Sequence, residues 1–264
     1  MGWEGNRLRH HLVGPPFAAH RAKRKRRKLG AQIDAASKRG FDIIVSASLL
    51  VLLAPVIAVV ALAIKLESRG PVFYRCRRVG RNGADLAMLK FRKMHHGASG
   101  PALVSWDDER FTRLGPFLAG TKLDELPQLW NVLRGQMSLV GPRPEDASFV
   151  KLLPGEYAVI NTVRPGITGL SQLAFAKESK VLDRDDREGD YVGRILPQKA
   201  RIDQLYAAER SFGMDLRILS WTALAVLLGR EVAVHRETGR LTRRDRPVLA
   251  TEGSPAMVLE RQRS

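Results

Sequence analysis

The sequence contains only one cysteine, Cys76, among its 264 residues. A single cysteine cannot form an internal disulfide framework, and it excludes a zinc site built on paired cysteines. Acidic residues are also scarce relative to basic ones, because 27 Asp and Glu stand against 44 Lys and Arg, for a net charge of +17. Such an excess favours an anionic partner, which could be nucleic acid, acidic lipid or a phosphorylated substrate.

Both ends of the chain are rich in charge. In residues 1–36, the run from Arg21 to Lys28 is almost entirely cationic. It cannot pack as a core, so we expect a flexible segment that contacts anionic lipid headgroups, with a short helical pattern beginning near Ile33. Residues 230–264 are charged, with scattered Gly, Pro and Thr, and are expected to form a disordered tail.

An uncharged stretch of 22 residues runs from Ile43 to Ile64. As a straight helix it would be roughly 33 Å long, enough for a bilayer core of about 30 Å. A buried helix of a soluble protein is the alternative, but the rest of the sequence is not apolar enough to surround one. We therefore expect residues 37–69 to be inserted in a membrane.

Pro55 lies near the middle of this stretch and predicts a kink, because proline lacks an N–H and clashes with the carbonyl of Val51. Both flanks are basic, and the positive-inside rule keeps Lys and Arg on the cytoplasmic side. A single span would export one basic flank, whereas a helix that breaks at Pro55 and returns exports neither. We therefore favour a re-entrant helix, with Ser46 and Ser48 as candidates to satisfy the broken backbone.

Residues 70–229 are expected to form a catalytic domain on the cytoplasmic face, mostly α with a small β component (α+β). Short strands are predicted at residues 72–74 and 86–89, on either side of a turn at 80–83. The polar region 174–200 is expected to be a loop or lid. An apolar helix is predicted at residues 215–228, which is too short to span a bilayer. Packing in the core and lying as an interfacial amphipathic helix, with Trp221 at the headgroups, both stay open.

Two adjacent carboxylates, Asp124 and Glu125, occur in the stretch TKLDELPQLWNVLRG at residues 121–135. Pro127 predicts a helix start and Gly135 its end. The carboxylates should therefore lie at the cap or first turn, where the helix dipole favours anions such as phosphate. Adjacent helical residues point about 100° apart, so the pair suits two separate roles, such as nucleophile and metal ligand. Plain helix capping is the alternative.

Three basic clusters accompany this pair. Arg143 lies between two prolines, which restrict its backbone and suit a bidentate phosphate contact. Arg164 lies on a Pro-Gly turn, and the run KFRKM supplies Lys90 and Arg92. Basic residues on rigid turns, a carboxylate pair and a membrane segment together indicate chemistry on a phosphate at a membrane surface.

In these motifs the chain resembles the bacterial sugar transferases, monotopic phosphoglycosyl transferases that begin glycan assembly on a polyprenol carrier. The resemblance runs from about residue 37 to residue 229. It is carried by KRGFD (38–42), the apolar stretch with its central proline, RVGRNG (78–83), KFRKM (90–94), LDELPQLWNVL (123–133), SLVGPRP (138–144) and VRPGITG (163–169).

The resemblance implies a two-step reaction. Asp124 would attack the sugar-linked phosphate of a UDP-sugar, release UMP and carry a covalent phosphosugar, which polyprenyl phosphate (expected to be undecaprenyl phosphate) then attacks. Glu125 would help to hold Mg²⁺. Candidate phosphate-binding residues are Lys90, Arg92, Arg143, Arg164 and Lys122, and candidate supporting residues are Asp203 and Tyr206.

The resemblance also implies a re-entrant membrane helix, a place on the cytoplasmic face of the inner membrane, and a role in exopolysaccharide, O-antigen or glycoprotein glycan assembly. Two departures from the family pattern stand out. Ala119 occupies a position that is often basic, for which Lys122 is expected to compensate, and Ala54 replaces a serine before the proline.

Other interpretations stay open at this point. They are an inactive membrane scaffold, a one-step transferase without a covalent intermediate, and a basic nucleic-acid-binding protein. The last is disfavoured because no nucleic-acid motif occurs and the apolar stretch would have no role, so nucleic acid is not expected as a partner. No pattern requires a homodimer, and none excludes one.

Overall fold

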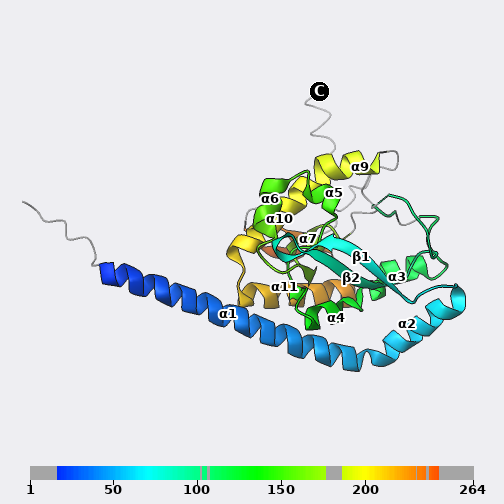
Figure 1. The fold of residues 1–264 in the computed structure, drawn as a ribbon, viewed down its shortest axis with the longest axis horizontal. Helices are drawn as coiled ribbons and strands as arrows, with labels where there is room; N and C mark the ends of the chain where they lie inside the picture. The colour runs from blue at the N-terminus through cyan, green and yellow to red at the C-terminus, as the bar shows by residue number, and fades with distance from the viewer. Residues whose placement is uncertain are drawn as a thin grey trace, which may run out of the picture. The chain divides into compact units, whose positions relative to one another are not determined.

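The computed structural model describes residues 17–101, 103–105, 108–176, 186–229, 231–235 and 238–243. The described residues are mostly helical with a small strand content, which confirms the α+β prediction (Figure 1). Residues 1–41 and residues 42–264 form separate compact units, and each is described by itself. The helices are α1 (Phe17–Leu52), α2 (Ala54–Glu67), α3 (Gly115–Thr121), α4 (Gln128–Leu133), α5 (Ala147–Val150), α6 (Pro154–Ile160), α7 (Leu170–Ala174), α9 (Arg187–Asp190), α10 (Leu196–Glu209) and α11 (Phe212–Leu228). The strands are β1 (Phe73–Val79), β2 (Asp85–Phe91), β3 (Ser138–Val140), β4 (Gly166–Thr168), β5 (Val232–Val234) and β6 (Leu241–Arg243).

The basic N-terminal region is helical from Phe17 onward, where the sequence was expected to be flexible. Alanine, lysine and arginine are strong helix formers, so the composition that prevents a core still favours a helix. The first 16 residues lie outside the described residues.

The apolar stretch is bent where the sequence predicts a kink. The pair Ala35–Leu52 and Ala54–Glu67 is bent by 61°, with Leu53 at the break and Pro55 in the first turn of α2. Proline is tolerated there because the first turn of a helix has no partner for its N–H. Among the described residues, no single helix is long and apolar enough to cross a membrane, although this bent pair passes that test of length and composition together.

Backbone hydrogen bonds continue across the bend. The Leu53 N–H donates to the Leu49 carbonyl at 2.8 Å, and the Ile57 N–H donates to the Leu53 carbonyl at 2.8 Å. Ser46 is fully buried, and its hydroxyl has no hydrogen-bond partner among the described residues. Hydrogen bonds of the helical ladder therefore continue on both sides of the break, and the Ser46 hydroxyl contributes none.

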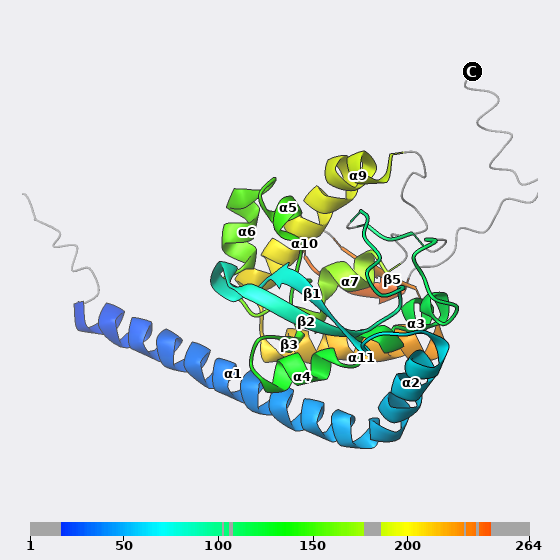
Figure 2. The ribbon, with the colours of Figure 1, turned by 45° about the vertical axis from the view of Figure 1, so that its right-hand side comes forward.

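Strands β1 and β2 form the predicted antiparallel hairpin, and both are longer than predicted. Phe73 pairs with Phe91 and Val79 with Asp85. Figures 1 and 2 both show this hairpin between a group formed by α5, α6, α9 and α10 and another formed by α4 and α11. The first group encloses a core of Phe149, Tyr157, Ile160, Tyr191, Ile195, Leu196 and Ala200.

A second, parallel pairing was not predicted. Strands β3 and β4 join Ser138 to Gly166 and Val140 to Thr168. Gly141 and Gly166 allow the two strand segments to approach closely, because a Cβ on either glycine would collide with the backbone of the other segment. This contact fixes the loop that follows β3 and carries Arg143.

The C-terminal part of the chain corrects three expectations. Region 174–200, expected as a loop or lid, contains α9, a π-helical turn at Tyr191–Ile195 and the start of α10, while residues 177–185 lie outside the described residues. Helix α11 begins at Phe212 rather than at residue 215, because the Ser211 hydroxyl accepts the Met214 N–H at 3.2 Å. Within the expected disordered tail, β5 and β6 form an antiparallel hairpin.

Candidate active site

Asp124 and Glu125 lie in a single 3-10 turn, Leu123–Glu125, just before α4. Pro127 is the N-cap residue of that helix, so the pair precedes its first turn by a few residues. Lys122 adopts a left-handed backbone with φ of 62° and turns the chain into the 3-10 turn. The turn leaves Asp124 only 1% exposed and brings Glu125 against the β1–β2 hairpin.

The carboxylate of Asp124 is buried but weakly satisfied. The Lys93 ammonium forms an ion pair with Asp124 Oδ2 at 2.9 Å, but neither Asp124 Oδ1 nor Oδ2 accepts a hydrogen bond among the described residues. A buried carboxylate normally accepts several hydrogen bonds, so an unpaired oxygen is costly unless a ligand engages it. Such an oxygen can act as a nucleophile or as a ligand for a cation.

Two cations hold Glu125. Lys90 Nζ lies 3.1 Å and Arg143 Nη2 3.2 Å from the same oxygen, Glu125 Oε1. Burial raises the pKa of Glu125, but Lys90, Arg143 and the nearby Lys122 outweigh burial and hold that pKa far below its ordinary value. Burial lowers the pKa of Lys90, and Glu125 offsets part of that effect. Glu125 is therefore ionised across the physiological pH range.

Asn131 places Lys90 in the site. Its side-chain Oδ1 accepts the Leu89 N–H at 2.9 Å, and its Nδ2 donates to the Ala87 carbonyl at 3.0 Å and to Gln136 Oε1 at 2.9 Å. The amide thereby takes the place of a neighbouring strand along the outer edge of β2. This joins α4 to β2 at the residues just before Lys90 and fixes the strand against the turn that carries the two carboxylates.

A buried charged cluster lies behind Arg143. Glu145 Oε1 accepts hydrogen bonds from the Tyr191 hydroxyl at 2.7 Å and from Lys199 Nζ at 3.0 Å. Asp203 accepts a hydrogen bond from the Ser171 hydroxyl at 2.9 Å, and burial raises the pKa of Asp203 to about 7. Arg143 contributes to the electrostatic environment of both acids, so the cluster links Asp203 to the site electrostatically.

Three residues expected at the site make other contacts. The Arg92 guanidinium donates to the carbonyls of Ser68 and Arg69 at the end of α2 rather than entering the carboxylate turn. Arg164 Nε donates to the Gly135 carbonyl at 2.9 Å, just beyond the end of α4. The Tyr206 hydroxyl lies 2.7 Å from Asp215 Oδ1 and 3.1 Å from the Val140 carbonyl, where it joins α10 to α11 and β3.

The structure therefore brings together Asp124, Glu125, Lys90 and Arg143, with Lys122 exposed at the entry to the turn. Lys93 is the site residue that the sequence analysis missed. It belongs to the same KFRKM run as Arg92, and only the end of β2 at Phe91 decides which of the two faces the carboxylates.

Magnesium is the one cofactor that the sequence suggested. Within the described ranges, no group of three or more His, Cys, Asp and Glu residues could hold a metal ion. Mg²⁺ commonly binds one or two carboxylates and completes its shell with substrate phosphate and water. Glu125 and the unpaired oxygen of Asp124 fit that smaller donor set.

Comparison with known proteins places the chain in context. The family described as bacterial sugar transferase matches residues 33–229. The chain is 41% identical over 196 residues to a UDP-glucose:undecaprenyl-phosphate glucose-1-phosphate transferase from Caulobacter vibrioides, covering 72% of this chain and 69% of that protein.

Two further relatives differ from the first in name and in how much of their length the chain covers. The chain is 38% identical over 205 residues to the exopolysaccharide production protein PSS of Rhizobium leguminosarum bv. phaseoli, covering 74% of this chain and 97% of that protein. It is 37% identical over 209 residues to a UDP-N-acetylgalactosamine-undecaprenyl-phosphate N-acetylgalactosaminephosphotransferase from Aeromonas hydrophila, covering 76% of this chain and 46% of that protein. The chain thus spans less than half of the Aeromonas relative.

Proposed function

The chain belongs to the bacterial sugar transferase family and is a phosphoglycosyl transferase, and from that premise we propose that it transfers a sugar 1-phosphate from a UDP-sugar to undecaprenyl phosphate and releases UMP. The Caulobacter and Aeromonas relatives are named for this reaction with two different sugars. The observation that carries the proposal here is the buried carboxylate of Asp124, which has an unpaired oxygen in a turn surrounded by cations.

The proposed reaction has two displacements at one phosphorus atom. In the first, an Asp124 carboxylate oxygen forms a bond to the sugar-bearing phosphorus as the bond to UMP breaks, and UMP leaves with the electron pair. In the second, a phosphate oxygen of undecaprenyl phosphate bonds to the same phosphorus, and the Asp124 carboxylate leaves. A carboxylate nucleophile thereby divides one difficult displacement into two easier ones.

The charge of the site suits a diphosphate substrate. Two carboxylates, Asp124 and Glu125, face four cations, Lys90, Lys93, Lys122 and Arg143, which gives an excess of two positive charges. The diphosphate of a UDP-sugar is doubly negative and matches that excess. Preorganised cations at a transferring phosphoryl group stabilise its charge without reorganising during the reaction.

The proposal includes Mg²⁺ as a cofactor. Glu125 would hold it together with substrate phosphate, and when bound it would neutralise phosphate charge. The protein's own residues perform the remaining tasks, since Lys90 and Arg143 keep Glu125 ionised and Asn131 keeps Lys90 in place.

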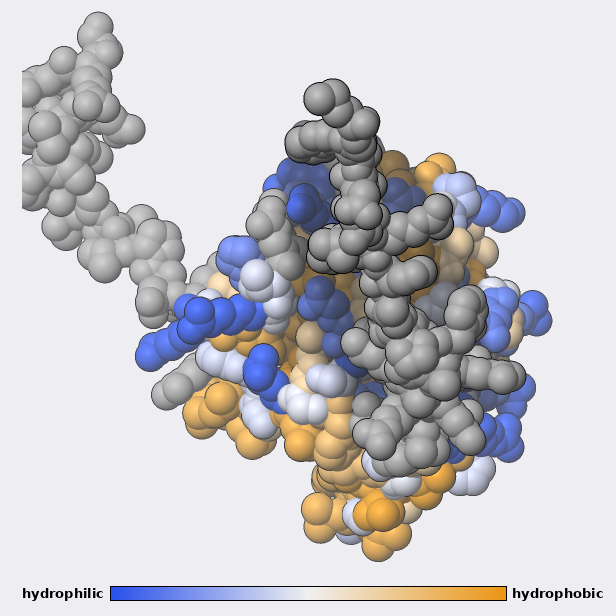
Figure 3. Space-filling model, turned by 90° about the vertical axis from the view of Figure 1, so that its left-hand side faces the viewer, coloured by the Kyte–Doolittle hydropathy of each residue, from blue (hydrophilic) through white to orange (hydrophobic). Residues whose placement is uncertain are grey.

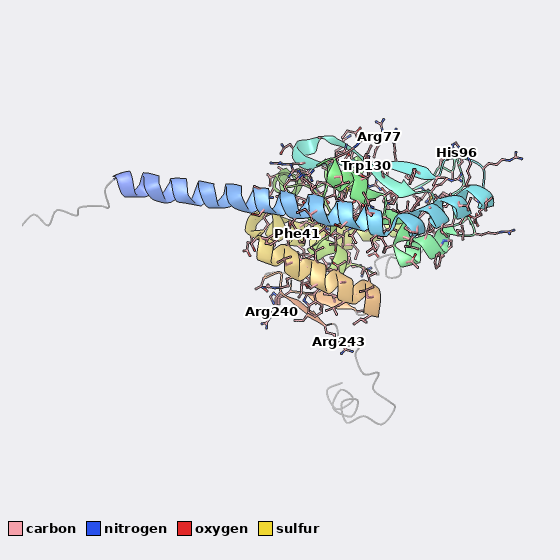
Figure 4. All side chains as sticks on the ribbon, turned by 90° about the horizontal axis from the view of Figure 1, so that it is seen from below. Phe41, Arg77, His96, Trp130, Arg240 and Arg243 are labelled. Carbon is pink, nitrogen blue, oxygen red and sulfur yellow. The ribbon has the colours of Figure 1, made fainter. Side chains whose placement is uncertain are left out.

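We further propose that the enzyme works at the cytoplasmic face of the inner membrane, with the bent pair α1–α2 as a re-entrant segment. Large apolar side chains are exposed on α2, α3, α4 and α11. They include Val59, Leu62, Leu66, Phe117, Trp130, Leu216, Val226, Leu227 and Leu228. Figure 4 views the molecule from below, where α2, α4 and α11 lie toward the viewer. Figure 3 is a side view, and hydrophobic residues gather along the lower edge of the molecule in it. So much exposed apolar surface is typical of a membrane-binding face, where a lipid-linked acceptor would be found.

Release of UMP tests the proposal. Detergent-solubilised protein with Mg²⁺ and undecaprenyl phosphate should release UMP from one member of a UDP-sugar panel. Asp124→Asn should lower this rate at least about a thousandfold, since it removes the nucleophile. Asp85→Asn, which changes a carboxylate that is 66% exposed, is the matched control and should retain the wild-type rate. Release that survives Asp124→Asn would refute the assignment of the nucleophile.

Trapping separates the two-step reaction from the one-step alternative. With a UDP-sugar labelled on the sugar phosphate and no acceptor, wild-type protein should retain label covalently, and Asp124→Asn should retain none. UMP release with acceptor but no retained label would favour a single displacement. Absence of release with every donor would favour the inactive scaffold.

A further inference from the structure

We infer that Lys93 is a further catalytic residue, whose ammonium group pairs with Asp124 in the free enzyme and passes to the transferring phosphoryl group as that carboxylate is consumed. The inference deepens the proposed function and rests on it. Its starting observation is the distance of 2.9 Å between Lys93 Nζ and Asp124 Oδ2, in a site where Lys90 and Arg143 contact the other carboxylate, Glu125.

The backbone of Lys93 is fixed from outside the site. Its carbonyl accepts the Thr112 N–H at 3.1 Å, and Gly115 packs so closely against the same carbonyl that a Cβ there would collide with it. The Phe111 ring lies 5.9 Å from Lys93 Nζ. These contacts hold the start of the side chain, while its flexible stem lets the ammonium move between neighbouring acceptors.

The charge on Asp124 changes during the proposed reaction, and Lys93 is placed to respond. When an Asp124 oxygen bonds to phosphorus, the carboxylate becomes an acyl phosphate ester and loses its negative charge. The new bond brings phosphoryl oxygens next to the atom that Lys93 already contacts. An ammonium with three donors can leave its ion pair and donate hydrogen bonds to those oxygens without backbone movement, and it then stabilises the charge of the transition state.

The exposure of the two side chains supports this order of events. Asp124 is 1% exposed, whereas the Lys93 side chain is 23% exposed, so Lys93 lies on the outer side of the carboxylate where a substrate would approach.

Kinetics give the first test. Lys93→Gln should lower kcat for UMP release about 100-fold while KM for the UDP-sugar changes less than about threefold, since the ammonium acts mainly in the transition state. Lys93→Arg should recover at least about tenfold of that loss. Arg77→Gln is the control for lost positive charge, because Arg77 is 85% exposed at the outer side of the hairpin (Figure 4), and it should leave kcat unchanged. Lys93→Gln with kcat within threefold of wild type would overturn the inference.

Binding of UDP gives a second test that needs no turnover. In Asp124→Asn, Lys93 loses its carboxylate partner, so its ammonium becomes available to a diphosphate. Calorimetry without Mg²⁺ should show that Asp124→Asn binds UDP about tenfold more tightly than wild type, and that this gain disappears in a Lys93→Gln background. A gain of the same size without Lys93 would overturn the inference. If no UDP-sugar supports turnover but the gain still depends on Lys93, the proposed function fails and Lys93 stands as a phosphate-binding residue.

Discussion

Replacing Arg92 by Gln should destabilise the protein while leaving its KM for the UDP-sugar unchanged. The Arg92 side chain donates to the carbonyls of Ile64, Ser68 and Arg69, at and just beyond the C-terminus of α2, and to the Ser68 hydroxyl. Carbonyls at the end of a helix lack intrahelical donors, and a cation there also complements the helix dipole. Arg92 therefore joins the apolar helix to the end of β2 from a position that is only 5% exposed.

The size of the effect follows from these contacts. Each hydrogen bond from a charged group to a carbonyl is worth about 1.5–3 kcal/mol, and removing the donor leaves the acceptors poorly satisfied. Since the bonds share one side chain and are not additive, we expect a loss of about 3–5 kcal/mol. For a domain of this size, each kcal/mol shifts Tm by about 2–4 °C, so Tm should fall by about 10 °C.

Thermal unfolding in detergent and steady-state UMP release would be measured together. Arg92→Lys should recover only part of the stability, because lysine lacks the planar fork that reaches two carbonyls. Arg81→Gln is the control: its exposed side chain also donates to a carbonyl, that of Thr162 at 3.2 Å, and its loss should cost less than about 1 kcal/mol. An unchanged Tm with a KM raised tenfold would show that Arg92 binds substrate phosphate after all.

Three further substitutions have defined outcomes. Burial raises the pKa of Asp203 in the folded protein to about 7 from an ordinary value of 3.8, so ionisation of its carboxyl group destabilises the fold as pH rises between those values. The free energy of unfolding of Asp203→Asn should therefore rise by about 3 kcal/mol relative to wild type between pH 5 and pH 8. Asn131→Leu leaves the Leu89 N–H and the Ala87 carbonyl without their partner, and it should lower both Tm and kcat. A kcat equal to that of wild type would contradict the role of Asn131 in placing Lys90. Lys199→Met leaves Glu145 buried without its cation and should cost about 3–5 kcal/mol at pH 8; a loss below about 1 kcal/mol would show that the Tyr191 hydroxyl suffices.

Local signals account for the features that the sequence predicted well. Residues 80–83 and the apolar positions beside them predicted the β1–β2 hairpin, because turn chemistry and strand composition act over a few residues. Pro127 predicted a helix start next to Asp124 and Glu125 for the same reason. The Ser211 cap of α11 and the helix-forming composition of the basic segment were equally local signals, and they were overlooked.

The choice between Arg92 and Lys93 was not predictable from local pattern. The period of two in a strand places Lys90 and Arg92 on one face, which favours both as phosphate-binding residues. Strand β2 ends at Phe91, however, and beyond it Arg92 turns to the end of α2 while Lys93 turns to Asp124. Where a strand ends depends on what packs against it, here α2 and the segment from Phe111 to Gly115, and neither is encoded beside the motif.

Long-range pairs were likewise beyond the sequence. The contact between Glu145 and Lys199 joins residues 54 positions apart, and the parallel pairing of β3 with β4 brings Gly141 against Gly166. Such contacts depend on the course of the whole chain rather than on a short pattern.

During synthesis, the outer edge of β2 stays unpaired until Asn131 is available. It lies 42 residues after Leu89, whose N–H it accepts, so at about 5–20 residues per second Asn131 follows Leu89 out of the ribosome some 2–8 s later. During that interval the edge offers unpaired backbone groups to any neighbouring strand, which is a known route to aggregation. Arg75 and Arg77 are exposed on β1 and give the newly formed β1–β2 hairpin a positive charge. This charge would repel the same hairpin of another nascent chain until Asn131 has paired with β2.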